Sequence, residues 1–218
     1  MALDDGWCWM ARLGCGRAWI QFVGDATARL SVQRLSDRFR SAVNALPELI
    51  PAGADFSIHR ARAAVARYST PTQAAGYLRI GDAAVSMDPL SGNGVYEALG
   101  SAQVGVAAIN TYLTGGAWSE IARFVNERAA ELWRRSVAAA GSFYRLQSER
   151  AACPFWLAAA STYERLALGA KSDETGPGRF EMRPVLNHQR IEVRRVWVNE
   201  EWPRGIWMPV PPAFQQEV

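Results

Sequence analysis

Two largely apolar runs at residues 7–12 and 18–22 have the alternating pattern of strands: Trp7, Trp9 and Ala11 alternate with Cys8, Met10 and Arg12, and Ala18, Ile20 and Phe22 form the second set. This alternation predicts two paired strands. An alternation of period two places every second side chain, such as Trp7 and Trp9, on the same face of a strand. Residues 14–16 contain two glycines and supply a turn between the two runs. The pattern therefore predicts a β-hairpin at the start of the chain.

Four later segments repeat their apolar residues at the three- and four-residue spacing of an α-helix. They are Leu30–Leu46, which Pro47 ends, Gly92–Leu113, Ser119–Tyr144 and Leu157–Leu168. The second segment contains a single charged residue, Glu97, so we expect it to be buried on most sides. The third places apolar residues opposite arginines, which is typical of a helix at the protein surface.

Shorter apolar runs predict strands at Phe56–Tyr68, Tyr77–Ile80 and Ile191–Val198, and Lys171–Gly178 has the composition of a linker. Strands and helices mixed in this way indicate an α/β or α+β fold. The expected organisation is a β-sheet portion at 1–70, a strand–loop–helix unit at 71–116, a helical region at 117–170, and a linker with a tail at 171–218.

The composition argues against nucleic-acid, membrane and metal partners. The 218 residues carry a net charge of +3, which is mild for a nucleic-acid-binding domain. No run of roughly 18 apolar residues could cross a membrane, and no signal peptide opens the chain. The three cysteines form no C-x-x-C pair and the two histidines lie far apart, so we expect no zinc site. These features predict a soluble, cytoplasmic protein.

The stretch from Tyr77 to Gly100 differs from the rest of the chain. A short apolar run ends in Gly-Asp at 81–82, a loop carries Asp-Pro at 88–89, and Gly-Asn-Gly at 92–94 precedes the expected helix. A carboxylate at a strand end can accept hydrogen bonds from sugar or polyol hydroxyls. The unpaired N–H groups of a helix start suit a phosphate or a delocalised anion. An ordinary tight turn between strand and helix is the alternative.

The order of these residues resembles the second flavin motif of the FAD-dependent aromatic monooxygenase and flavin halogenase superfamily. The resemblance implies that FAD is the cofactor, that Asp82 bonds its ribityl chain, and that the helix start faces the pyrimidine side of the isoalloxazine. Pro89 would then lie beside the ring, near where oxygen reacts. The residues that the resemblance assigns to the cofactor are Gly81, Asp82, Asp88, Pro89, Leu90, Gly92, Asn93, Gly94 and Val95.

The expected hairpin resembles the substrate-domain sheet of the same superfamily, and Trp7-x-Trp9 is similar to the start of the halogenase signature WxWxIP. Ile-Pro is absent at 11–12, and Gly-Asn at 92–93 stands where halogenases carry two hydroxyl residues. The catalytic lysine of halogenases has no counterpart, since Lys171, the sole lysine, lies in the expected linker. The resemblance therefore favours hydroxylation, with Trp7 and Trp9 as candidate substrate contacts and no catalytic base assigned.

Within this superfamily the motif is similar to that of flavin monooxygenases that hydroxylate a protein-borne tryptophan during quinone-cofactor maturation. The substrate would be an aromatic small molecule or a protein-borne tryptophan, and a reductant or flavin reductase would be a further partner. A flavin-dependent halogenase is one alternative function. A non-catalytic remnant that acts as a binding or scaffold protein is the other.

The glycine fingerprint G-x-G-x-x-G, which binds the ADP half of FAD, does not precede the motif. The earlier G-x-G at 14–16 lies in the expected hairpin turn, and Trp19 stands where the third glycine belongs. We therefore expect an incomplete FAD-binding, Rossmann-like domain, with its C-terminal part at 71–116. The chain would correspond to the C-terminal portion of a longer enzyme, or would work with an N-terminal partner chain.

Overall fold

A computed structural model describes residues 1–14, 16–25, 32–46, 50, 55–57, 61–70, 73–74, 76–169 and 179–198. The chain divides into two compact units. The first contains Met1–Ala64 and Gly141–Tyr163, and the second contains Val65–Ala140 and Glu164–Val218. The long helices are thus shared between the units, whereas the sequence predicted a separate helical region at 117–170.

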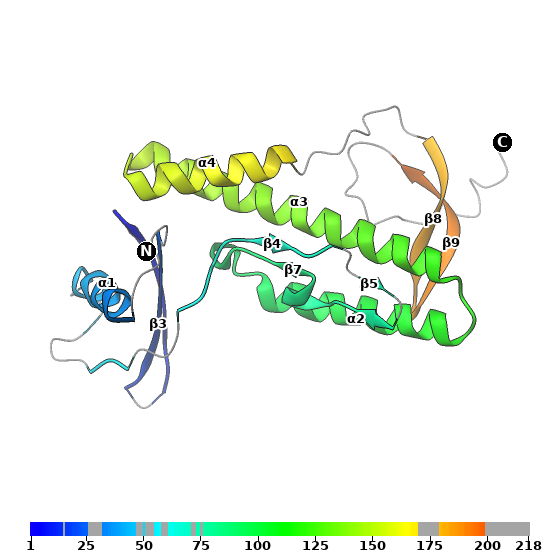
Figure 1. Ribbon diagram of the computed structural model, residues 1–218, viewed down its shortest axis with the longest axis horizontal. Helices are drawn as coiled ribbons and strands as arrows, with labels where there is room; N and C mark the ends of the chain where they lie inside the picture. The colour runs from blue at the N-terminus through cyan, green and yellow to red at the C-terminus, as the bar shows by residue number, and fades with distance from the viewer. Residues whose placement is uncertain are drawn as a thin grey trace. The chain divides into compact units, whose positions relative to one another are not determined.

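The first unit contains the predicted hairpin. Strand β2 (Gly6–Arg12) pairs antiparallel with β3 (Ala18–Gly24), and the two-residue strand β1 (Ala2–Leu3) pairs with the other side of β2. Helix α1 (Val32–Asn44) covers one face of this sheet (Figure 1). Cys8 of β2 packs there against Ala42 and Leu46, because alternate residues of a strand point to one face.

An aromatic cluster completes the first unit. Tyr144 stacks on Tyr163 with ring centroids 5.2 Å apart, and Phe155 and Trp156 pack around Tyr144. The Trp156 indole N–H donates a hydrogen bond of 2.8 Å to the carbonyl oxygen of Leu3. Buried indoles usually find such a polar partner, so the N–H of Trp156 is satisfied within the apolar cluster.

The second unit is built on two antiparallel helices, α2 (Gly94–Leu113) and the first part of α3 (Trp118–Arg150), which lie side by side (Figure 1). The turn between them contains Gly115, whose φ of 84° lies in the left-handed region that favours glycine. Helix α4 (Pro154–Gly169) follows α3. These helices confirm the helical predictions. Among the described residues, no helix is long and apolar enough to cross a membrane.

The core of the second unit lies between α2, α3 and the C-terminal hairpin. Its buried residues are Val104, Ala107, Ala108, Ile121, Phe124, Val125 and Ile191. They occupy one side of α2 only. The opposite side of α2 exposes large apolar side chains, so the expectation that this helix is buried on most sides is wrong for the chain as described.

Short strands precede α2 in the chain. Strand β4 (Arg67–Tyr68) pairs with β7 (Val85–Ser86), and β5 (Gln73–Ala74) pairs with β6 (Tyr77–Leu78), both antiparallel. The predicted strand at Phe56–Tyr68 is wrong for most of its length, because residues 55–57 and 61–66 form no strand. Residues 58–60 lie outside the described part of the chain.

The C-terminal hairpin consists of β8 (Arg179–Asn187) and β9 (Arg190–Val198). The sequence predicted β9 but not β8. His188 forms the turn with a φ of 53°, a conformation that a non-glycine residue adopts rarely. The predicted linker at 171–178 and the proline-rich tail beyond 198 lie outside the described residues.

Candidate functional site

The end of β6 is fixed to α2 by a chain of hydrogen bonds. Gly81 has a φ of 56°, and its backbone N–H donates to Ser101 Oγ at 2.7 Å. The Ser101 hydroxyl in turn donates to the carbonyl oxygen of Ala98 at 2.8 Å. Glycine is required at this turn because the left-handed conformation is costly for residues with a Cβ. These bonds fix the position of the 3-10 turn Gly81–Ala83, which follows β6 and contains Asp82.

Asp82 lies at the protein surface. The residue is exposed and lies in the single 3-10 turn Gly81–Ala83. Within the part of the chain that the structure describes, its carboxylate makes no hydrogen bond or ion pair. An exposed, unpaired carboxylate beside a rigid backbone turn can accept hydrogen bonds from a ligand's hydroxyl groups.

Asp88 has a different role in the loop. Its side chain is buried, and its Oδ1 accepts a hydrogen bond of 2.8 Å from the Leu90 backbone N–H. In this way it caps the 3-10 turn Pro89–Ser91, and the Ser91 hydroxyl donates to its carbonyl oxygen at 2.9 Å. Asp88 therefore shapes the loop from inside, and its carboxylate is engaged there.

The start of α2 is open. Gly92 has a φ of 67°, and Asn93 occupies the N-cap position without a capping side-chain hydrogen bond. A Cβ placed on Gly92 or Gly94 would meet open space, and Val95 is 77% exposed. The first N–H groups of the helix thus face an uncovered surface where a ligand can approach the backbone.

A small cavity lies behind this surface. Its volume is about 40 Å³, and its walls come from the 78–85 segment, from α2 and from α3. Arg128 and Arg135 of α3 line it together with Asp82 and Ser101. Small-molecule sites usually have volumes of roughly 300–1,000 Å³, so a flavin ring would have to lie outside this cavity, on the open side of the loop.

Sequence reasoning missed Ser101 and Arg128. Ser101 gave no local signal, since the hydroxyl meets Gly81 only through the fold. Arg128 belongs to a helix whose arginines were interpreted as a solvated face. The predicted residues Gly81, Asp82 and Gly94, however, line the same cavity, so the fold brings the strand end and the helix start together.

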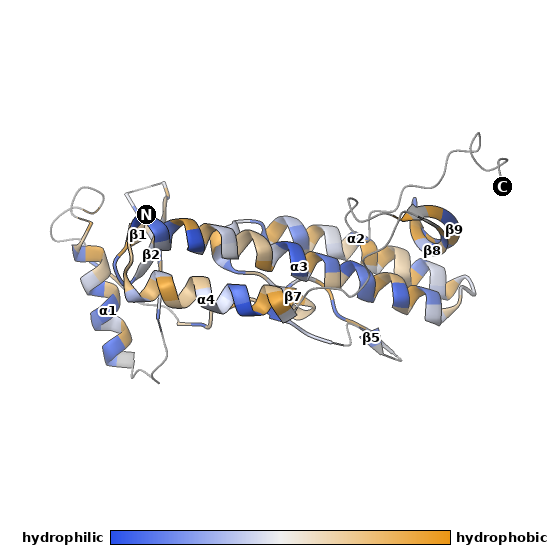
Figure 2. Cartoon of the chain, turned by 90° about the horizontal axis from the view of Figure 1, so that it is seen from above, coloured by the Kyte–Doolittle hydropathy of each residue, from blue (hydrophilic) through white to orange (hydrophobic). Residues whose placement is uncertain are grey.

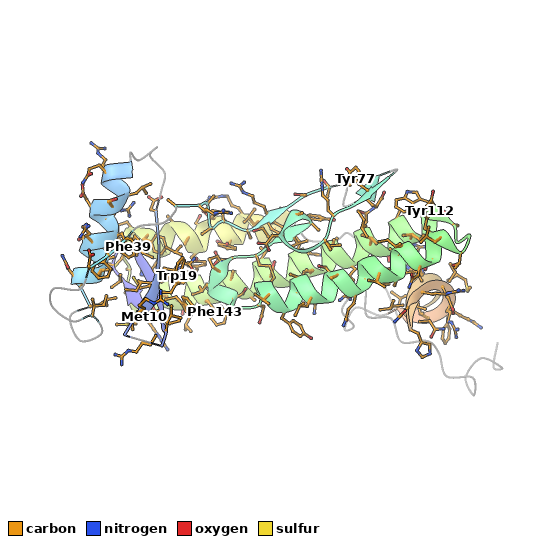
Figure 3. All side chains as sticks on the ribbon, turned by 90° about the horizontal axis from the view of Figure 1, so that it is seen from below. Met10, Trp19, Phe39, Tyr77, Tyr112 and Phe143 are labelled. Carbon is orange, nitrogen blue, oxygen red and sulfur yellow. The ribbon has the colours of Figure 1, made fainter. Side chains whose placement is uncertain are left out.

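The two candidate substrate tryptophans have different environments in the first unit. Trp7 is buried, and its indole N–H donates to the Tyr144 hydroxyl at 3.3 Å. Trp9 is 50% exposed and stands opposite Gln21 in the hairpin register. Trp19, opposite Ala11, shares its face and is 49% exposed. Figure 3 labels the Trp19 side chain on this hairpin. The alternation of residues 18–22 was the signal that could have identified Trp19.

The fold brings Gly81 and Asp82 to the same cavity as Gly94 at the start of α2. The sequence matches no protein-family model and no curated protein. Among solved structures, the chain is similar to the peptidyl tryptophan dihydroxylase QhpG, essential for tryptophylquinone cofactor biogenesis. The TM-score is 0.76 with 30% sequence identity, over 95% of this chain and 49% of QhpG.

A second solved structure has the same fold. The chain is similar to CmlS, a flavin-dependent halogenase, with a TM-score of 0.67 and 19% identity, over 97% of this chain and 50% of CmlS. The chain therefore spans about half the length of each structure that it matches. These similarities confirm the predicted fold class and the resemblance to hydroxylases and halogenases.

Proposed function

We propose that this chain forms the isoalloxazine and ribityl side of the cofactor site in an FAD-dependent aromatic monooxygenase. The observation that carries the proposal is the pairing of an exposed, unbonded Asp82 with an uncapped start of α2, both held by the same loop. The 30% identity to a peptidyl tryptophan dihydroxylase supports a hydroxylase over other functions.

The residues present fit a flavin. Gly92 and Gly94 leave room for a planar ring to approach the backbone, because a Cβ at either position would point into open space. The helix start places partial positive charge there, which stabilises a negative charge on the pyrimidine side of a reduced flavin. Asp82 would accept hydrogen bonds from the ribityl hydroxyls. Pro89 stiffens the loop beside the ring.

The bound flavin would supply the oxygen chemistry, which amino-acid side chains cannot perform alone. The chain itself would orient the ring through the loop at 88–95 and would bind the ribityl chain through Asp82. The open aromatic face that carries Trp9 and Trp19 is the candidate contact for an indole substrate. We propose a protein-borne tryptophan as that substrate, and a flavin reductant or reductase as the source of electrons.

Equilibrium dialysis against FAD tests the cofactor assignment. We expect the isolated chain to bind FAD about a thousandfold more weakly than a complete enzyme of this kind, because lost ADP contacts worth about 4 kcal/mol have that effect. Asp82→Ala should weaken the remaining affinity by about 1.5–3 kcal/mol. Asp55→Ala, another exposed aspartate, is the matched control and should leave it unchanged. Equal affinities for wild type and Asp82→Ala would refute the role of Asp82.

A halide experiment separates hydroxylation from halogenation. Chain co-purified with an ADP-binding half would be supplied with FAD, a reductant, oxygen, bromide and a tryptophan-containing peptide. Because Gly92-Asn93 replaces the hydroxyl pair of halogenases, mass spectrometry should find oxygen added to the peptide and no bromine. A brominated peptide would assign the chain to the halogenases instead.

A further inference from the structure

We propose that the uncovered side of α2 is the docking surface for a helix of the polypeptide that supplies the ADP-binding half of the cofactor site. This inference rests on the function proposed above. The surface consists of Val95, Leu99, Ala102, Val106, Ile109 and Leu113, which we call the open stripe. Its large members are each at least half exposed, from 50% for Val106 to 77% for Val95.

The spacing of the open stripe identifies the kind of element that fits it. Its members follow one another at intervals of four, three, four, three and four residues. That repeat is the pattern by which one helix packs along another at a small crossing angle. Over 18 residues the stripe is about 27 Å long, at 1.5 Å per residue. A strand or a loop would not match a continuous seam of this length.

The open stripe lacks the charge that a solvated helix face needs. Glu97 is the only charged residue of α2, and the other side of the helix is already buried in the core of the second unit. Figure 2 shows α2 largely pale to orange, whereas α3 beside it carries several blue turns. A helix that is apolar all round is normally buried all round. Exposed apolar patches of this kind mark interaction sites.

The position of the open stripe favours the ADP-binding half as its occupant. The stripe begins at Val95, the second residue of α2, just after the exposed residues Gly92 and Asn93, so a helix along it would end beside the loop at 88–93. The chain covers 49% of QhpG and 50% of CmlS, and each of those folds therefore contains a second half of equal size. A second copy of this chain would bring another isoalloxazine side and no ADP side.

Co-expression with the half of QhpG that this chain does not match tests the proposal. The complex would be purified without FAD and measured by sedimentation velocity. We expect a one-to-one complex, whose dissociation constant rises at least about tenfold for Leu99→Glu and for Ile109→Glu. Leu146→Glu and Leu157→Glu, at apolar positions of similar exposure outside the stripe, are the matched controls and should not change it. Circular dichroism of each variant checks that the helices stay folded.

Three outcomes would overturn the proposal. They are the absence of a complex, a complex that is insensitive to both stripe variants, and a homodimer of this chain alone that the stripe variants abolish. The last would identify a second copy as the occupant. Because the complex is measured without FAD, its failure is distinct from failure of the proposed function. A complex that forms but takes up no FAD would remove the function and leave the docking surface in place.

Discussion

Helices α2 and α3 lie side by side in the second unit, but they differ in how well the apolar residues of each helix match its buried side. On α3, apolar residues such as Ile121 and Phe124 are buried, and several charged residues form ion pairs. Arg123 meets Glu127 of the next turn at 3.1 Å, an i,i+4 pair on the helix surface. On α2 the apolar residues continue around the helix, although one side of it is exposed.

The difference between the two helices indicates which helix surfaces are apolar enough to be buried against another element. In the second unit, which contains α3 up to Ala140, the pattern of α3 matches its environment, since none of its large apolar side chains there is among the exposed ones. The pattern of α2 requires more cover than the second unit supplies. Burying apolar surface contributes about 25 cal/mol per Å². The open stripe can make this contribution only when another element covers it. The following predictions test this contrast.

The largest expected effect is a difference in stability between a substitution in the core between α2 and α3 and a substitution on the open stripe. Phe124→Ala, in the core between α2 and α3, should lower the free energy of unfolding by about 3–5 kcal/mol. Leu99→Ala, on the open stripe, should change it by about 0.5 kcal/mol or less, since the side chain is already 65% in solvent. Urea denaturation of both variants measures the contrast. Similar losses would mean that the open stripe is covered in solution.

The buried side of α2 also contains a polar contact. Thr111 Oγ1 accepts a hydrogen bond of 2.8 Å from the Ile191 backbone N–H and donates one of 2.7 Å to the Ala107 carbonyl oxygen. Thr111→Val keeps the volume but leaves that N–H buried without an acceptor, which should cost about 1–3 kcal/mol. Thr114→Val removes the same kind of bond at an exposed position and is the control. Equal urea midpoints for the two variants would mean that the bond from Thr111 to the Ile191 N–H does not stabilise the fold.

The sequence predicted the hairpin and the helices because their periodic patterns extend over many residues. It failed where the pattern was short or interrupted. Strand β8 was missed because Pro184 argues against a strand interior, but in this two-stranded hairpin it stands opposite Val193 on a strand with a free edge. The arginine-rich segment Phe56–Tyr68 has the alternating pattern of a strand, but of its described residues only Arg67–Tyr68 pairs with a neighbouring strand.

At the candidate site, the sequence predicted which residues gather but not what each contacts. Asp82 and the start of α2 lie at the surface, as a ligand site requires. Their assignment to the cofactor stays a prediction. Asp88 is occupied inside the loop, a role that the sequence Asp-Pro-Leu could have indicated, because aspartate often caps the N–H two residues later. The Ser101 contact depends on residues 20 positions apart in the chain, which no local pattern encodes.

A smaller effect is expected at the strand end. Ser101→Ala removes the acceptor of the Gly81 N–H, which is partly buried, and should lower the free energy of unfolding by about 1 kcal/mol. Because this bond fixes the turn that carries Asp82, the variant should also weaken FAD binding in the dialysis experiment. Ser148→Ala, whose hydroxyl bonds only the Arg145 carbonyl on the same exposed helix face, is the control. Unchanged stability in both variants would show that the strand end is held by other contacts.

An effect of similar or smaller size is expected for the ion pair between α3 and β8. Arg183 of β8 contacts Glu127 of α3 at 2.6 Å, and its side chain is only 12% exposed. Burial lowers the pKa of Arg183, but its bonds to Glu181 and Glu127 outweigh this and raise the pKa, so the guanidinium stays charged. Arg183→Met retains the apolar stem and removes the charge, which should cost about 0.5–1 kcal/mol at low salt.

The comparison pair for Arg183 lies on the same hairpin. Arg194 meets Glu192 at 2.6 Å, but both side chains are more than a third exposed, at 46% and 38%. Water and salt screen such a pair, so Arg194→Met should change stability by only a few tenths of a kcal/mol, roughly the lower limit for exposed pairs. Thermal unfolding at low and at high salt would separate the two. If both losses are equal and vanish with salt, the contact between α3 and β8 is a surface pair, and α3 depends on its neighbours only through its apolar face.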